Sequence, residues 1–363
     1  MKSRSTTAFP HLKLTAALAA LLLAPVAGCG GGKGGGPAAD APSFSLAWSE
    51  YPSWSVFGVA HEKGLIDKAE GKMGEVEKKW GVDIVLVQAD YDACLNQYGS
   101  STVDAVCMTN MDSLAPATGR DSVAVLPTST SAGADACVAV GAGSIEDLKG
   151  VPTFGLELSV SQYAFERCLE KKGLDPADYE FRNMDPANAA QAMQAGDAEV
   201  RSIMVWNPFV LQTLRDREGA KRMFDSTEIP EEIIDMVVVS KSALEKEGGD
   251  KFAKAVIDAF YRVNAMLADE ATRPDTLTAL GEKFSSLGVE DMEVVVTETQ
   301  MYKTAEEGIA LFEKADFQAK IMPMVVDFCV ANKIVEEKPT VGFADTAAQL
   351  NFDASYMKAV SSE

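Results

Sequence analysis

Residues 82–126 read VDIVLVQADYDACLNQYGSSTVDAVCMTNMDSLAPATGRDSVAVL, and this stretch decides the fold class. Its three short apolar runs, 82–87, 103–108 and 122–126, are strand-like, and helix-like segments separate them. Strands that alternate with helices in this way are typical of a parallel sheet that is covered on both faces. The sequence therefore predicts an α/β fold.

The same alternation extends in both directions from this stretch. Upstream, we expect a strand at 44–48 and helices at 55–63 and 66–80. Downstream, the expected strands are 137–140, 153–156, 179–182, 202–206 and 233–239. One helix of this second unit has clear boundary signals, because Asp185-Pro186 is a helix start and Gly196 is a helix stop.

The chain beyond residue 240 is expected to be mostly helical. Phe252, Val256, Phe260, Val263 and Leu267 are spaced to form one apolar stripe of a long helix, which is a core pattern. The further expected helices are 290–300, 304–313 and 316–332. Because they have no new sheet to cover, we expect them to pack on the first unit.

These units predict two lobes, each a mostly parallel sheet flanked by helices. The expected first lobe consists of 43–130 and 235–363, and the second lobe is 131–234. The chain would cross between lobes at 127–135 and return at 229–235, so the two crossings would form a hinge. A ligand is expected in the cleft between the lobes, where strand ends and helix N-termini meet.

Residues 1–28 are expected to be a signal peptide, since three basic residues and no acidic one accompany the short apolar run 14–24. The following Val26-Ala-Gly-Cys29 resembles a bacterial lipobox, which makes Cys29 the expected lipidated N-terminus. Ordinary signal cleavage beside an incidental cysteine is the alternative. The Gly-rich segment 29–42 fits a flexible tether. We therefore expect an exported domain, anchored to the bacterial membrane and facing the periplasm or the cell exterior.

Composition excludes several classes of function. The chain of 363 residues has 54 acidic and 33 basic residues, a net charge of -21, so nucleic acid is not an expected partner. The two histidines, His11 and His61, lie apart, which disfavours His-based metal sites and Ser-His-Asp catalysis. We expect no cofactor, no metal and no catalytic residue, although a periplasmic enzyme on the same scaffold remains the other class.

Five cysteines follow Cys29: Cys94, Cys107, Cys137, Cys168 and Cys329. Their odd number and the lack of C-x-x-C spacing predict at least one free, buried thiol. One or two disulfides are compatible with an exported protein, and the pairing stays open.

Candidate ligand-binding residues fall at the expected strand ends and in the loops after them. They comprise three tryptophans (Trp48, Trp54, Trp206), four acids (Glu50, Asp112, Glu157, Asp235) and six short polar residues (Thr109, Asn110, Ser131, Ser159, Ser161, Asn207). Each has an ordinary alternative, because tryptophans are commonly core residues and single acids commonly face solvent. Ser159 is equally well placed to cap a helix.

Five segments, in this order, resemble one receptor family: MTNMD (108–112), SAGAD (131–135), LELSVSQY (156–163), VWNP (205–208) and FDSTEIPEEIIDMVVV (224–239). The family comprises the nitrate, sulfonate and thiamine-precursor receptors of ABC importers, and the branch that these segments resemble accompanies urea carboxylase genes. The resemblance spans about residues 44–335 and implies a type II periplasmic-binding-protein fold and an ABC permease as partner. It also implies a monomer that binds urea or guanidine.

Two departures from the family pattern stand out. Relatives often have Trp-Glu-Pro where this chain has Trp206-Asn207-Pro208, so one carboxylate is missing from a turn that is expected to face the ligand. The Cys-rich iron motif of pyrimidine-synthesising relatives is also missing, which removes the best enzymatic interpretation.

The residue types at the strand ends favour a small planar nitrogen compound, guanidinium first and urea second. Guanidinium pairs with carboxylates through forked donors and lies flat on aromatic rings. An anion would instead need Arg, Lys or free helix N-termini, and the nearest basic candidates, Arg120 and Arg167, do not directly follow strands. A sulfonate, nitrate or pyrimidine receptor is the alternative.

Overall fold

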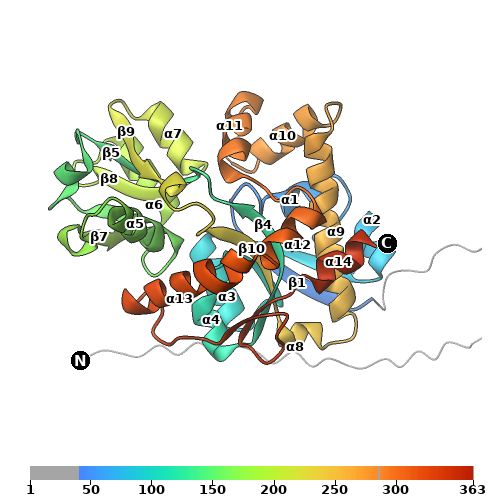
Figure 1. The fold of residues 1–363 in the computed structure, drawn as a ribbon. Helices are drawn as coiled ribbons and strands as arrows, with labels where there is room; N and C mark the ends of the chain where they lie inside the picture. The colour runs from blue at the N-terminus through green and yellow to red at the C-terminus, as the bar shows by residue number, and fades with distance from the viewer. Residues whose placement is uncertain (1–40, 285–286, 363) are drawn as a thin grey trace, which may run out of the picture. The chain divides into compact units, whose positions relative to one another are not determined.

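The computed structural model describes residues 41–284 and 287–362, and within them the strands form two sheets (Figure 1). The first sheet has the order β11-β12-β4-β10-β3-β1-β2. Its strands are β1 (Ser43–Trp48), β2 (Asp83–Gln88), β3 (Ala105–Thr109), β4 (Ser122–Thr130), β10 (Ile234–Ser240), β11 (Val341–Phe343) and β12 (Leu350–Phe352). All of its pairings are parallel except those of β10, which runs antiparallel to β3 and β4.

The second sheet has the order β7-β6-β8-β5-β9. Its strands are β5 (Asp135–Val140), β6 (Thr153–Gly155), β7 (Phe181–Asn183), β8 (Ser202–Trp206) and β9 (Ala220–Asp225). The β6 pairings are parallel and the β5 pairings are antiparallel, so this sheet is mixed rather than mostly parallel. The chain passes from β4 to β5 and returns from β9 to β10.

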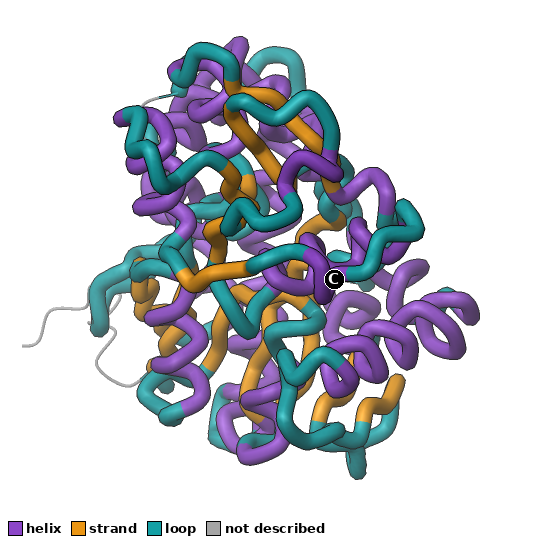
Figure 2. Tube along the Cα trace, turned by 90° about the vertical axis from the view of Figure 1, so that its left-hand side faces the viewer, coloured by secondary structure: helices purple, strands orange, loops and turns teal. Residues whose placement is uncertain are grey.

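Helices flank both sheets (Figures 1 and 2). Those beside the second sheet are α5 (Val160–Lys171), α6 (Pro186–Ala195) and α7 (Phe209–Asp216), with short 3-10 turns at Ile145–Leu148, Pro176–Asp178 and Ser226–Glu228. Those of the first sheet are α1 (Val56–Glu62), α2 (Glu75–Trp80), α3 (Tyr91–Gly99), α4 (Leu114–Gly119), α8 (Lys241–Leu244), α9 (Gly249–Ala268), α10 (Arg273–Gly281), α11 (Val289–Thr299), α12 (Ala305–Phe312), a π-helical turn (Phe317–Ile321), α13 (Met322–Ala331) and α14 (Ser355–Ser361). We call each sheet with its helices lobe 1 and lobe 2.

Several sequence expectations are confirmed. Phe252, Val256, Phe260, Val263 and Leu267 are all buried on one face of α9, which contacts α1, α2 and α14. The helix predicted between Asp185 and Gly196 is α6, where the Asp185 side chain accepts a hydrogen bond from the Asn188 N–H at 3.0 Å. All five cysteines of the described residues are free and buried, so the expectation of at least one free, buried thiol is also confirmed.

One expected helix is wrong in its bounds, and three strands were not expected. Residues 66–74 are not helical and only 75–80 form α2; the Gly74 backbone instead lies so close to Leu65 that a Cβ would stand 2.4 Å from the Leu65 carbonyl oxygen. The region after β10 is mostly helical, as expected, but β11 and β12 extend the first sheet beside β4. Strand β9 is a further difference from the expected elements; it forms the edge of the second sheet beside β5.

The predicted signal peptide, lipidated Cys29 and most of the tether lie outside the described residues. Among the helices that the structure describes, none has the length and apolar character that crossing a membrane requires.

Candidate ligand-binding site

A small enclosed cavity lies where residues from both lobes meet. Half of its lining residues are aromatic, and the full set is Tyr51, Trp54, Tyr91, Thr109, Asp135, Val160, Trp206 and Asp235. The space open to the centre of a water molecule is about 10 Å³. This is about the minimum for one ordered water, so the site has almost no free volume in this structure.

The pairing of strands within each sheet positions the two aspartates of the cavity wall, Asp135 and Asp235. Asp235 of β10 lies opposite Thr109 of β3 in lobe 1, and Asp135 of β5 lies opposite Trp206 of β8 in lobe 2. The two aspartates thus come from different sheets, and both line the same cavity. The register of each sheet therefore brings residues that are distant in the sequence to one place.

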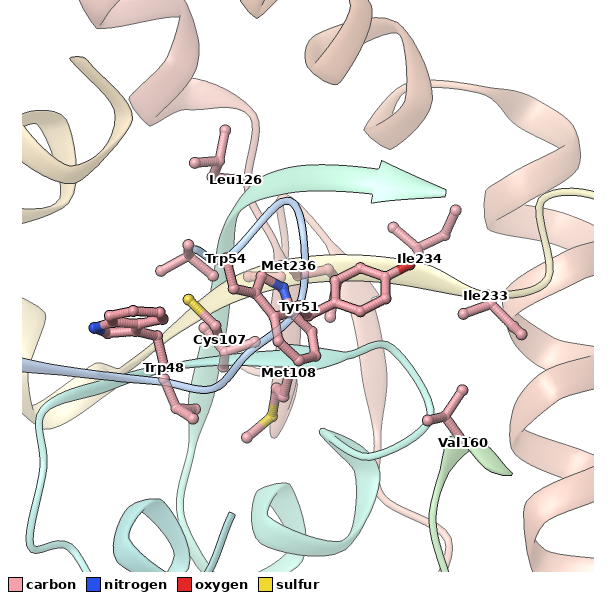
Figure 3. Packing of buried hydrophobic residues seen from close by; sticks show 14 of the residues in the cluster. Trp48, Tyr51, Trp54, Cys107, Met108, Leu126, Val160, Ile233, Ile234 and Met236 are labelled. Carbon is pink, nitrogen blue, oxygen red and sulfur yellow. The ribbon is translucent and has the colours of Figure 1, made fainter. Parts of the chain in front are cut away.

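The four aromatic rings are in contact with one another. Trp54 packs against Tyr51 with ring centroids 4.8 Å apart, and it stacks on Tyr91 at 5.2 Å. Tyr91 meets Trp206 edge to face at 5.5 Å, with an interplanar angle of 80°. Because Tyr91 belongs to lobe 1 and Trp206 to lobe 2, this aromatic wall continues across the two lobes. Figure 3 shows Tyr51 and Trp54 side by side among the core residues.

Asp112 is a third buried carboxyl beside the cavity. Its Oδ2 accepts hydrogen bonds from the Tyr91 hydroxyl at 2.6 Å, from Thr109 Oγ1 at 2.8 Å and from the Val160 N–H at 3.3 Å, and these three residues line the cavity. Its Oδ1 is buried and has no hydrogen-bond partner among the described residues. This oxygen of the Asp112 carboxyl is therefore unsatisfied within the described part of the protein.

The two carboxyls that line the cavity have few partners of their own. Asp235 Oδ2 accepts a hydrogen bond from Ser129 Oγ at 2.5 Å. At Asp135 it is the backbone N–H, and not the carboxyl, that bonds Ser131 Oγ, at 3.1 Å. Within residues 41–284 and 287–362, neither these two carboxyls nor Asp112 forms an ion pair, and no group of three or more His, Cys, Asp or Glu side chains is arranged to hold a metal ion.

Burial without a cation changes the acidity of all three carboxyls. Desolvation raises the pKa of Asp112 to about 6, against the effect of its hydrogen bonds. Desolvation, together with the charge of Asp112, raises the pKa of Asp135 to about 7. The pKa of Asp235 rises well above its ordinary value, mainly through burial and further through the charge of Asp135. A bound cation would favour the ionised form of each group.

Other buried polar atoms near the cavity also lack partners among the described residues. They are Trp54 Nε1, Trp206 Nε1 and Ser161 Oγ. Buried polar groups in folded proteins are nearly always hydrogen-bonded to protein, water or ligand. These donors and acceptors beside the aromatic rings are therefore free to bond a polar group.

Comparison with known proteins finds one matching family and several solved structures with a similar fold. Residues 101–281 match the NMT1-like family. No curated protein sequence matches the chain. Solved structures do share the fold, among them three whose sequences are less than 20% identical to this chain.

These three structures illustrate the shared fold. The alkanesulfonate-binding protein SsuA from Xanthomonas axonopodis pv. citri, bound to MOPS, has a TM-score of 0.65 and 17% identity, and the match covers 83% of this chain and 96% of that one. The periplasmic aliphatic sulphonate binding protein SsuA from Escherichia coli has a TM-score of 0.61 and 18% sequence identity, and the match covers 82% of this chain and 89% of that one. The periplasmic nitrate-binding protein NrtA from Synechocystis PCC 6803 has a TM-score of 0.59 and 11% sequence identity, and the match covers 89% of each chain. The predicted α/β periplasmic-binding-protein fold is thus confirmed.

The structure brings five of the predicted ligand-binding residues together. Trp54, Thr109, Trp206 and Asp235 line the cavity, and Asp112 is bonded to its wall. A sixth, Ser161, is buried in the first turn of α5, next to Val160 of the wall. Whether any of them contacts a ligand remains a prediction.

Three tryptophan and acid candidates lie elsewhere. The Trp48 ring packs against α1, since a Cβ on Gly58 would stand 2.9 Å from it, and Figure 3 shows its indole nitrogen directed away from Trp54 and Tyr51. Glu157 is exposed in a surface depression beside Tyr179. Glu50 is half-buried and lines a second cavity, which shares part of its wall with the first.

The remaining polar candidates have structural partners. Asn110 ties β3 to β10 by accepting the Ile234 N–H at 3.0 Å. The Asn207 amide donates to Glu298 Oε2 at 2.7 Å. Ser131 shares a hydrogen bond with Ser226, and Ser159 caps α5 by accepting the Ser161 N–H. Satisfied side chains of this kind support the backbone of the site rather than offer free groups to a ligand.

Sequence reasoning missed four residues of the wall, Tyr51, Tyr91, Asp135 and the apolar Val160. Tyr51 and Tyr91 each have a strand-end signal, because they follow β1 and β2 by three residues. Asp135 ends the SAGAD segment and begins β5, so its position was visible although its role was not. The two tyrosines were missed because only tryptophans, and not tyrosines, were considered among the aromatic residues that follow the strands.

Proposed function

We propose that this protein is an extracytoplasmic solute receptor that encloses a small planar nitrogen compound, guanidinium first and urea second, and delivers it to an ABC permease. One observation carries the proposal: Asp112, Asp135 and Asp235 are buried around one aromatic-walled cavity, and none of them is ion-paired within the described residues. Burying three carboxyls without a cation costs free energy, which a cationic ligand would recover.

Guanidinium fits the chemistry of this wall. Its flat, charged plane can lie against Trp54, Trp206 or the tyrosine rings, and cation–π contacts of this kind contribute about 0.5–2 kcal/mol. Its forked N–H donors match carboxylate oxygens, so Asp135 of lobe 2 and Asp235 of lobe 1 could each accept from it. A ligand held by acids from both lobes would favour the closed arrangement.

The same geometry disfavours the anionic alternatives. The α5 N-terminus faces the site, yet its Val160 N–H donates to Asp112 and its Ser161 N–H donates to Ser159 Oγ. An acid of the chain thus occupies the place where a helix N-terminus would bind a sulfonate or nitrate. Arg167 is paired with Glu232 at 2.9 Å, and Arg120 donates to the Val103 carbonyl at 2.9 Å.

Urea stays as the second candidate because of a specific feature. Trp54 and Trp206 each carry an indole N–H that is buried without a partner among the described residues. An indole N–H is only a donor, so it suits the carbonyl oxygen of urea and not guanidinium. Urea would need the acids to be protonated, whereas guanidinium needs them ionised.

We also propose that the protein is a monomeric, lipid-anchored receptor rather than an enzyme. The lipobox-like segment ending at Cys29 and the Gly-rich segment after it support the anchor. The fold shared with sulfonate- and nitrate-binding proteins supports a transport role. An assay for turnover of a bound ligand separates this proposal from the enzymatic alternative, since a receptor would release its ligand unchanged.

Thermal-shift measurements on the purified protein test the ligand proposal. Guanidinium, urea, nitrate and taurine would be compared at millimolar concentration, and we expect guanidinium to raise the unfolding temperature most. Asp235→Asn should remove the guanidinium shift, while the exposed control Asp92→Asn should keep it. A shift with taurine or nitrate alone would contradict the proposal.

A further inference from the structure

A second cavity adjoins the buried site on the outside. Its volume is about 310 Å³. Tyr91 and Trp206 belong to the walls of both cavities. Those two rings meet edge to face at 5.5 Å, one from each lobe. The aromatic pair therefore forms a partition that would part when the lobes separate.

The outer cavity is acidic. Glu50, Asp90 and Asp185 line it, and no Lys, Arg or His is among its described lining residues. None of the three acids forms an ion pair within the part of the chain that the structure describes. Burial raises the pKa of Glu50, and the charge of Asp90 raises it further.

A buried polar group in the same wall points to an occupant. Ser49 is only 3% exposed, and its Oγ has no hydrogen-bond partner among the described residues. A hydroxyl oxygen can accept a hydrogen bond from an N–H donor of a ligand. Acids, an unpartnered hydroxyl and the faces of Tyr91 and Trp206 together form a surface suited to an organic cation.

We propose that this outer cavity is a first binding site for a small organic cation, held by Glu50 and Asp90 before it passes between Tyr91 and Trp206 into the buried site. The inference rests on the proposed function, because it assumes that the buried site takes a cation. Acid-lined clefts concentrate cations and accelerate their association by about 10-fold to 1,000-fold. The outer acids would therefore set the association rate, and the buried acids would set the dissociation rate.

Stopped-flow tryptophan fluorescence of the full chain with guanidinium chloride, at low ionic strength and about pH 8, tests this inference. The double variant Glu50→Gln with Asp90→Asn should lower the association rate constant by about threefold or more, with the dissociation rate constant changed less than about twofold. The reduction should shrink at high salt because screening weakens steering. Asp90 is exposed, so the single variant Asp90→Asn gives the same test with little risk to folding.

The matched control removes two exposed acids outside the cavity, Asp92→Asn with Asp121→Asn. It has the same net charge as the test variant, and its association rate should stay near the wild-type value. Equal rates for wild type and test variant, or an equal loss in the control, would overturn the outer site alone. If calorimetry shows that wild type binds no guanidinium, both the outer site and the proposed function fall.

Discussion

Asp112 Oδ2 accepts a hydrogen bond from the backbone N–H of Val160 at 3.3 Å, and this contact joins the two lobes. Asp112 follows β3 of lobe 1, while Val160 is the first residue of α5 in lobe 2. The positive end of the α5 dipole thus faces a carboxyl of the chain itself. What the site still lacks among the described residues is a positively charged side chain, and a cationic ligand would supply that charge.

Removing one buried charge should weaken guanidinium binding. Asp135→Asn and Asp235→Asn keep the shape of the side chain but remove its charge, and each should cost about 2 kcal/mol or more, which is about 30-fold in affinity. Isothermal titration calorimetry measures the loss. Asp92→Asn, an exposed acid on α3, is the control and should bind like wild type. Unchanged affinity in both site variants would contradict the roles given to these acids.

Guanidinium affinity should depend on pH. The pKa values of Asp112, about 6, and Asp135, about 7, mean that acidification from pH 8 to pH 5 protonates groups that the cation needs ionised. Affinity should therefore fall steadily over this range, whereas urea binding should improve or stay constant. Titrations at several pH values check this, and a flat profile for guanidinium would show that these carboxyls do not hold the ligand.

The contribution of Asp135 to the stability of the ligand-free protein should fall as pH rises, whereas guanidinium affinity should rise with pH. Asp135 has a pKa of about 7 in the folded state, above its ordinary value of 3.8, so the folded state binds the proton more tightly than the unfolded state. Its favourable contribution is complete below the unfolded pKa and is lost as pH rises through the folded pKa. Asp135→Asn should therefore raise the unfolding temperature at pH 8 and have a smaller effect at pH 5. Equal effects at both pH values would contradict the raised pKa.

The anchor can be tested independently of the ligand. Cys29→Ser removes the thiol that would receive the lipid, so the protein should move from the membrane fraction to the soluble extracytoplasmic fraction. Fractionation with immunoblotting, alongside a Cys94→Ser control whose thiol is buried in lobe 1, measures this. Membrane association that survives Cys29→Ser would refute the lipobox interpretation.

Local patterns predicted the elements better than the site. The α9 stripe and the Asp185 cap are set by residues a few positions apart, so the sequence displays them directly. By contrast, β11 and β12 have only three residues each and show no alternation that would reveal a strand. Their pairing beside β4 joins segments more than 200 residues apart, which no local pattern encodes.

Only part of the site was predicted, because a local pattern shows a residue's type and position but not its distant partners. Trp54, Trp206 and Asp235 were found because they are unusual residue types at strand ends. Asn110 and Asn207 satisfied the same rule, but their amides are engaged by Ile234 and Glu298, which are far away in the sequence. Which strand-end side chains are free and which are satisfied depends on such long-range partners, and only the folded structure supplies them.

The most direct test of the account is a calorimetric comparison of guanidinium, taurine and nitrate with the purified wild-type protein at about pH 8, where the carboxyls are most ionised. The account predicts saturable binding of guanidinium at a single strong site and no heat of binding from either anion. Tight binding of taurine or nitrate, with guanidinium inert, would contradict the central claim that three buried aspartates and an aromatic wall form a site for a small nitrogen cation.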